Sequence, residues 1–199
     1  MADNSVSDDA MADDLTPPTR TGLRRRRAAE RLPVRLLGDP VLREKAAPIA
    51  ADAFDDELRQ LVDDMFVTMD AEEGAGLAAP QVGISKRVFV VDARRDGGGK
   101  ESRFALVNPR VVEVSDEIDA GPEGCLSIPG VSDVVRRPAQ VTMEGHDVDG
   151  NPVRVTGSGL LGRALLHELD HLDGILFVDH LSPLKRRMLL KKYRKLQEE

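Results

Sequence analysis

Apolar residues recur with a helical period in the stretch that follows the first 50 residues. The positions i, i+3, i+4, i+7, i+8 and i+11 are held by Leu58, Leu61, Val62, Met65, Phe66 and Met69. Residues with this spacing share one face of a helix, so the pattern predicts an amphipathic helix over about residues 55–71. Gly74 and Gly76 follow, and glycine is common where helices end.

The middle of the chain either alternates in polarity or is rich in valine, which is typical of strands. The predicted strands are 87–92, 103–107, 110–114, 131–135, 140–147 and 152–156. Turn signals at 97–99 and 149–151 separate some of them. Because these segments follow one another closely without intervening helices, we expect antiparallel pairing.

Two further helices are predicted towards the C-terminus. Over residues 160–172 apolar side chains surround the helix axis, which is typical of a helix in the core, and Gly174 is expected to end it. Over residues 183–197 basic residues dominate. The face expected to dock this last helix is formed by Leu184, Met188, Tyr193 and Leu196.

Length, charge and cysteine content narrow the class of protein. A chain of 199 residues fits one domain, and its net charge of −7 disfavours non-specific nucleic-acid binding by the molecule as a whole. No run approaches the roughly 20 apolar residues of a membrane span, so we expect no membrane association. Cys125 is the only cysteine, which excludes an intramolecular disulfide and favours a reducing, cytoplasmic compartment.

Residues 1–30 are expected to form a disordered tail, and residues 31–199 the folded domain. The first 19 residues contain five aspartates and no basic residue before Thr19, and an arginine run follows at 24–27. Without hydrophobic periodicity such a segment cannot offset the entropy of ordering. A solvated tail is the favoured interpretation; an arginine run that binds an acidic partner, and a true start at Met11, remain open.

The predicted buried helix carries a polar cluster that points to a metal. It reads His167-Glu168-Leu169-Asp170-His171. Two histidines at i and i+4 lie one above the other on one helical face, so both imidazoles can meet one ion, and Glu168 can reach water on that ion. Polar groups in an apolar helix are costly unless they are satisfied, which favours a metal over two core histidines bonded to backbone.

A hydrolytic metal site needs a third protein ligand and one open position. The long metzincin spacing would require a histidine where Phe177 stands. Cys125, flanked by small residues, is the favoured third ligand, and sulfur favours zinc or ferrous iron over magnesium or calcium. The less suitable downstream candidates are Asp173, Asp179, Glu198 and Glu199.

Three motifs together resemble the peptide deformylase family. They read GAGLAAPQ at 74–81, EGCLS at 123–127 and HELDH at 167–171. The resemblance covers about residues 33–197 and includes the sequence LSPL at 181–184. It implies an α+β fold in which antiparallel strands wrap around a buried metal-binding helix, with a C-terminal helix. One departure is Leu166, where many members have glutamine before the first histidine.

The resemblance implies an enzyme that removes the N-formyl group from N-formylmethionine of newly made polypeptides and releases formate. Cys125, His167 and His171 would hold one divalent metal ion, Fe²⁺ in the cell, for which Zn²⁺, Ni²⁺ or Co²⁺ can substitute. Water on this ion would attack the formyl carbon, with Glu168 as general base. Residues 31–199 would then be the catalytic domain.

Further roles follow from the same resemblance. The Gln81 amide and the Leu126 backbone N–H would stabilise the oxyanion, and the Gly76 backbone would pair with the peptide substrate. Independently of the resemblance, carboxylates close to metal ligands often support them, so Asp170 is expected to orient a ligand or to pair with Arg137; a simple surface charge is the alternative. The walls expected for the methionine slot are residues 74–77, Ile84, Ala164 and Leu165. We expect a cytoplasmic monomer whose basic C-terminal helix either contacts ribosomal RNA near nascent chains or simply closes the fold.

Two other functions remain open at this point. The first is a zinc metallopeptidase of the HExxH type, against which Gln81 and the cysteine motif argue. The second is a non-catalytic metal-binding module, in which His146 and His180 would complete a structural site with four protein ligands.

Overall fold

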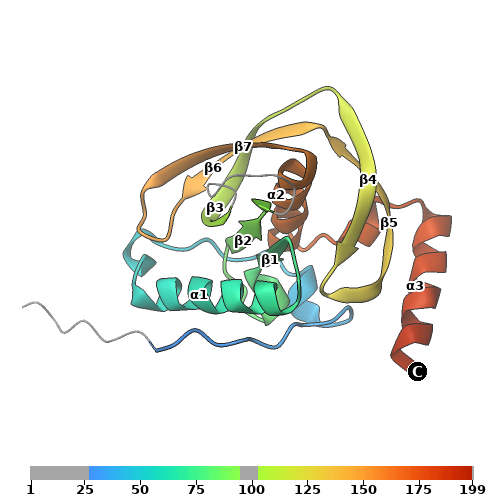
Figure 1. The fold of residues 1–199 in the computed structure, drawn as a ribbon, viewed down its shortest axis with the longest axis horizontal. Helices are drawn as coiled ribbons and strands as arrows, with labels where there is room; N and C mark the ends of the chain where they lie inside the picture. The colour runs from blue at the N-terminus through green and yellow to red at the C-terminus, as the bar shows by residue number, and fades with distance from the viewer. Residues whose placement is uncertain (1–26, 95–102, 199) are drawn as a thin grey trace, which may run out of the picture.

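The computed structural model describes residues 27–94 and 103–198 (Figure 1). The turn predicted at 97–99 and most of the tail predicted at 1–30 lie outside these residues. Residues 27–32, which are described, run along helix α1 (Asp56–Ala71). There Arg27 pairs with Asp64, and the Leu32 N–H donates to Thr68 Oγ1.

All strand pairs in the two sheets of the described chain are antiparallel, as predicted. The larger sheet has the order β1-β2-β3-β6-β7. Its strands are β1 (Gly76–Ala78), β2 (Val88–Asp92), β3 (Arg103–Val114), β6 (Gln140–His146) and β7 (Pro152–Ser158). The smaller sheet is a hairpin of β4 (Ile118–Cys125) and β5 (Ile128–Pro138). The predicted α+β class is therefore confirmed.

Strand β3 replaces the two separate strands predicted at 103–107 and 110–114. Asn108 interrupts the ladder with a φ of 51°, and its side chain bonds both the N–H and the C=O of Ile49 at 2.8 Å. The pairing with β6 shifts register at this point, so the chain bulges without ending the strand.

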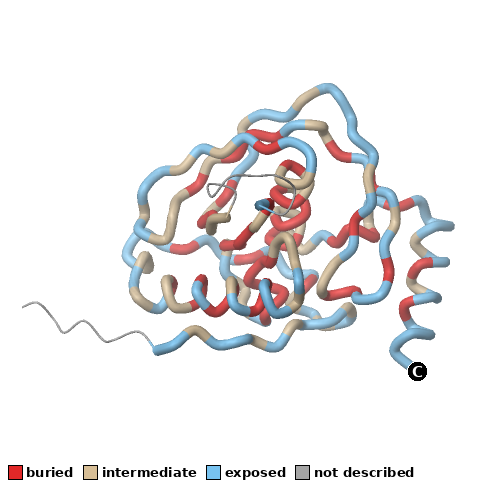
Figure 2. Tube along the Cα trace, in the orientation of Figure 1, coloured by how far each residue is buried: buried red, intermediate tan, exposed pale blue. Residues whose placement is uncertain are grey.

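Helix α2 (Gly159–Leu172) lies in the centre of the molecule, between the larger sheet and the β4–β5 hairpin (Figures 1 and 2). It contacts β1, β2, β6 and β7. Two glycines allow this close packing, because a Cβ at Gly162 would lie 2.8 Å from the Gly157 carbonyl oxygen on β7. The predicted buried helix is confirmed, and its apolar side chains pack in one hydrophobic cluster with residues of the larger sheet.

Helix α3 (Pro183–Glu198) docks through a face that matches the predicted one only in part. Leu184, Met188 and Leu196 are 62%, 65% and 40% exposed, whereas Leu189 and Tyr193 are buried against β5. Tyr193 docks as predicted, but the prediction was wrong for Leu184 and Met188 and missed Leu189. The helix carries apolar residues on two faces, and the surface of the hairpin selects between them. Among the described helices, none combines the length and apolar composition that crossing a bilayer requires.

Leu106 on β3 is fully buried, so replacing it with alanine is expected to destabilise the fold. We expect Leu106→Ala to lower the free energy of unfolding by about 2–5 kcal/mol, because it leaves a cavity among close-packed side chains. Exposed Leu184→Ala is the matched control and is expected to change it by less than about 0.5 kcal/mol. Urea denaturation measures both, and equal losses in the two variants would contradict the described core.

Candidate metal centre

Two elements far apart in the sequence bring three ligand side chains together. Cys125 ends strand β4, while His167 and His171 lie one helical turn apart on α2. One ligand atom from each lies within 4.8 Å of the others, and Cys125 Sγ is 3.2 Å from His171 Nε2. The predicted Cys-His-His set is therefore confirmed, and its donors suit zinc or ferrous iron.

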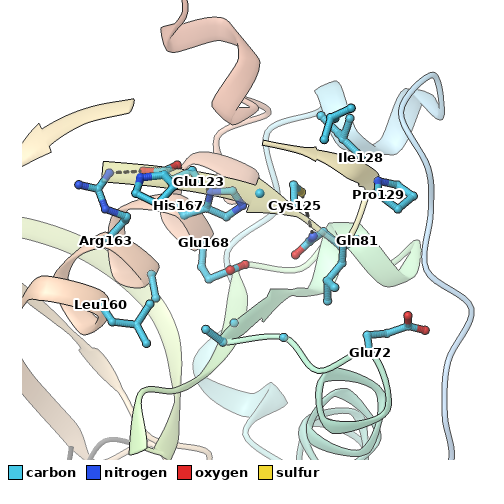
Figure 3. Close-up of a pocket in the computed structure, with 18 of the residues that line it drawn as sticks. Glu72, Gln81, Glu123, Cys125, Ile128, Pro129, Leu160, Arg163, His167 and Glu168 are labelled. Carbon is cyan, nitrogen blue, oxygen red and sulfur yellow. Dashed lines mark hydrogen bonds and ion pairs between the residues drawn. The ribbon is translucent and has the colours of Figure 1, made fainter. Parts of the chain in front are cut away.

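Glu123 orients the first of these histidines. Its Oε2 lies 3.0 Å from His167 Nδ1 and 2.9 Å from Arg137 Nη2. Its Oε1 accepts from Arg137 Nε at 2.9 Å and from Arg163 Nη1 at 3.0 Å (Figure 3). A carboxylate held by two arginines is an acceptor, so His167 Nδ1 carries the proton and Nε2 offers its lone pair to a metal.

Glu123 is the first residue of the EGCLS motif, but no role was predicted for it from the sequence. Residues two apart on a strand share a face, so Glu123 and Cys125 point to the same side of β4. That signal could have identified Glu123, but β4 itself was not predicted. Its sequence, IDAGPEGC, contains glycine and proline, which disfavour strands yet are tolerated in a two-stranded hairpin.

Burial and hydrogen bonding act in opposite directions on these groups. Burial favours the neutral acid of Glu123, but hydrogen bonds from His167 and Arg137 hold its pKa well below the usual value. Burial also opposes charging of His167, but its hydrogen bonds with Cys125 and Glu123 raise its pKa well above the usual value. Burial lowers the pKa of His171 well below the usual value, with the His167 charge adding to the effect.

Asp170 pairs with Arg137, which was one of the interpretations that the sequence left open. Arg137 Nη1 lies 2.7 Å from Asp170 Oδ2, and His180 Nε2 lies 2.7 Å from the same oxygen. His146 instead stacks edge-on against Phe54, with ring centroids 5.7 Å apart. Neither His146 nor His180 joins the metal-ligand group among the described residues, which argues against a structural site with four protein ligands.

Glu168 lies beside the ligands and is almost fully buried. Its Oε2 is buried and has no hydrogen-bond partner in the described part of the chain. Burial raises the pKa of Glu168 to about 7, and the nearby Glu123 and Asp170 charges oppose the lowering effect of His167. Gly76 makes room for this side chain, because a Cβ there would lie 2.8 Å from Glu168 Cδ.

Gln81 is held with its amide nitrogen facing the ligands. Its Oε1 accepts from the Ala78 N–H at 2.8 Å, which leaves Nε2 3.5 Å from Cys125 Sγ and 3.3 Å from Ser127 Oγ (Figure 3). Leu126 follows Cys125 directly and lines the same cavity. The sequence-predicted residues Gly76, Gln81, Leu126 and Glu168 therefore all surround the three ligands.

A cavity of about 520 Å³ is lined by two of the three ligands, Cys125 and His167. Of the walls expected for a methionine slot, residues 74–76 and Ala164 line it, joined by Leu160 and Arg163. Leu77, Ile84 and Leu165 do not line it and pack in the hydrophobic core instead. Leu166, the departure from the family motif, is half-buried and also packs against the core.

A group of three protein ligands, two of which line a cavity, is typical of catalytic metal sites, because structural sites usually close with a fourth protein ligand. The unpartnered carboxylate of Glu168 also fits this arrangement, since a buried polar atom without a partner is costly unless a ligand or a reaction uses it. Fold and site together define a mononuclear metal hydrolase.

Comparison with known proteins identifies the family. Residues 31–187 match the family model described as polypeptide deformylase. The chain is 45% identical to the peptide deformylase of Brucella suis biovar 1 (strain 1330) over 84% of this chain and 94% of the relative. It is 48% identical to the peptide deformylase of Parafrankia sp. (strain EAN1pec) over 82% of this chain and 86% of that relative.

Solved structures agree with the sequence comparison. The crystal structure of a peptide deformylase from Legionella pneumophila superposes with a TM-score of 0.78 at 43% identity, covering 84% of this chain and 96% of that one. The chain belongs to the polypeptide deformylase family, and its activity is that of a peptide deformylase, a hydrolase.

Glu123→Gln is expected to weaken metal binding, because an amide places a donor against His167 or against an arginine. Loss of such a supporting contact typically lowers metal affinity about 10–100-fold. Chelator competition with Zn²⁺ measures the affinity. The matched control is Glu144→Gln, since Glu144 also pairs with two arginines, Arg110 and Arg154, but at the surface. Unchanged affinity in Glu123→Gln would show that His167 needs no such support.

Proposed function

We propose that this enzyme hydrolyses the formamide bond of N-formylmethionyl peptides, releasing formate and a free amino terminus, and that residues 31–199 are its catalytic domain. The observation that carries the mechanism is the buried Glu168 carboxylate beside Cys125, His167 and His171, whose Oε2 has no hydrogen-bond partner among the described residues. A metal held by these three residues would polarise the formyl group and lower the pKa of water from about 15.7 towards about 7.

Glu168 acts as the general base and then as the general acid. Its carboxylate accepts a proton from the attacking water and returns that proton to the nitrogen of the departing amine. Deep burial keeps bulk water from competing for the carboxylate. The tight fit of Gly76 against the side chain supports this role, because it limits the positions that the carboxylate can take.

The Gln81 amide and the Leu126 N–H stabilise the negative charge that develops on the formyl oxygen. Fixed donors of this kind are effective because they need no reorganisation during the reaction. The bond from Ala78 to Gln81 Oε1 supports this role, since it leaves the Nε2 donor pointing towards the ligands.

The peptide binds as an added strand beside β1, with the Gly76 backbone as its partner. Strand β1 is at the edge of the larger sheet, and residues 74–76 line the cavity. Pairing through main-chain groups accepts many downstream sequences. The methionine side chain enters the cavity between residues 74–76, Leu160 and Ala164. A peptide deformylase from Acinetobacter baumannii has been crystallised with Met-Ala-Ser bound, and one from Synechococcus elongatus in complex with actinonin.

We propose Fe²⁺ as the metal in the cell, with Zn²⁺, Ni²⁺ or Co²⁺ able to substitute. One sulfur and two imidazole nitrogens are donors that all four ions accept. The protein acts as a monomer in the cytoplasm on nascent chains, and its helix α3 contacts the ribosome. Lys191 and Lys192 are exposed on this helix and support an electrostatic partner such as RNA.

Formate release by anaerobically purified protein, with the metal content of the same sample determined, tests this function. We expect turnover of formyl-Met peptides, and none of acetylated peptides or of internal peptide bonds. Cleavage of internal bonds without formate would instead support a metallopeptidase.

Glu168→Gln is expected to fold and retain the metal while losing activity by about 10²–10⁴-fold or more, because the amide cannot accept the proton. Formate release and metal content, measured on the same preparation, separate the two effects. Normal turnover would remove Glu168 from the mechanism, and loss of the metal would indicate a structural role.

Charge reversal on α3 is expected to weaken ribosome association. The variant is Lys191→Glu, Lys192→Glu and Lys195→Glu together, and co-sedimentation with ribosomes at several salt concentrations measures binding. Reversal of Lys45 and Lys86, exposed elsewhere on the surface, is the control and is expected to leave binding intact. Equal binding by the α3 variant and the unmodified protein would rule out this contact.

A further inference from the structure

Arg163 connects the two elements that carry the metal ligands. It lies on α2, one turn before His167, and its side chain is only 11% exposed. Its Nη1 donates to Glu123 Oε1 and to the Val135 carbonyl oxygen, both at 3.0 Å, and its Nη2 donates to Asp119 Oδ2 at 2.7 Å. All three acceptors belong to the β4–β5 hairpin.

We infer that Arg163 is a positioning residue for the metal centre, acting through Glu123 on His167. Cys125 comes from the hairpin and the two histidines come from α2, so the ligand set exists only while these elements keep their relative position. Arg163 and His167, at i and i+4 on α2, both bond the Glu123 carboxylate, one at each oxygen. The guanidinium therefore fixes the carboxylate that orients the His167 ring.

The hairpin is shaped to admit this guanidinium. Gly121 faces Arg163, and a Cβ at this position would lie 2.9 Å from Arg163 Nη2. The planar fork of arginine reaches three acceptors at once, which the single ammonium of lysine cannot do. Arg137 also links the two elements, through Asp170 on α2, but it lies on the same hairpin as Glu123 and therefore cannot tie the Glu123 carboxylate to the helix.

Without Arg163, Oε1 of Glu123 keeps a bond from Arg137 alone. The carboxylate keeps its two bonds with Arg137 inside the hairpin, but it loses the bond that ties its Oε1 to α2. The position of Glu123 relative to the His167 ring is then less constrained. Partners of this kind commonly change metal affinity by about 10–100-fold, so we expect an effect near the lower end of that range for a residue one step further from the metal.

The test measures Co²⁺ affinity by chelator competition, together with the visible absorption spectrum of the Co²⁺ protein. Arg163→Leu is expected to weaken binding by about 10-fold and to alter the spectrum, because the geometry of the nitrogen ligands is less constrained. Arg154→Leu is the matched control, since Arg154 pairs with Glu144 on the larger sheet at the surface, and it is expected to leave both readouts unchanged.

A second variant reaches the same contact without removing the arginine. Gly121→Ala is expected to displace the guanidinium and to weaken Co²⁺ binding in the same direction. In the Arg163→Leu background the same change is expected to have little further effect, because the contact is already lost. Arg163→Lys keeps the positive charge but lacks the planar guanidinium. Its Co²⁺ affinity is expected to lie between those of the unmodified protein and Arg163→Leu.

Co²⁺ affinity within twofold of the unmodified protein in folded Arg163→Leu would overturn the inference. If that variant does not fold, the double variant Gly121→Ala with Arg163→Lys takes its place. Losses of Co²⁺ affinity that simply add in this double variant would also overturn the inference. The inference rests on the metal centre of the proposed function, but its readout does not require formate release. A failure of the deformylase assay in the unmodified protein is therefore distinguishable from a failure of the role assigned to Arg163.

Discussion

The hydrogen bond between Glu123 and His167 joins the two halves of the molecule at the point where the chemistry takes place. The hairpin supplies the carboxylate and Cys125, and α2 supplies the imidazoles. Each element packs into its own hydrophobic cluster, α2 against the larger sheet and β5 against α3. Apolar contacts have no direction and cannot set the angle of a ring. Hydrogen bonds to Glu123 can set the angle of the His167 ring, because two donors in fixed positions hold each carboxylate oxygen.

Such a cluster of charges in a core of leucine, valine and alanine is costly unless every group has a partner. Glu123, Arg137 and Asp170 meet this condition through their mutual bonds. Glu168 does not, because Oε2 is buried without a partner in the described residues. His171 Nδ1 is likewise buried without a partner in this part of the chain. Both atoms belong to residues of the proposed metal centre, and buried polar groups without partners are expected mainly at functional sites.

The elements with strong periodicity were predictable from sequence, and so were the ligands. The apolar stripes at 55–71 and 160–172 match α1 and α2 closely, and the i, i+4 histidines with a lone cysteine identified the metal site. Strand β4 was not predicted, because Gly121, Pro122 and Gly124 are residues that disfavour strands. Without the strand, the role of Glu123 could not be predicted either. The docking face of α3 depends on the hairpin surface, which no local pattern on the helix encodes.

X-ray absorption spectroscopy of the Zn²⁺-loaded protein tests the metal centre most directly, since it reports the donor atoms themselves. Binding by Cys125, His167 and His171 predicts one sulfur at about 2.3 Å and two imidazole nitrogens at about 2.0–2.1 Å, with a solvent oxygen in the remaining position. A shell without sulfur, or one closed by four protein ligands, would contradict both the ligand set and the open position on which hydrolysis depends.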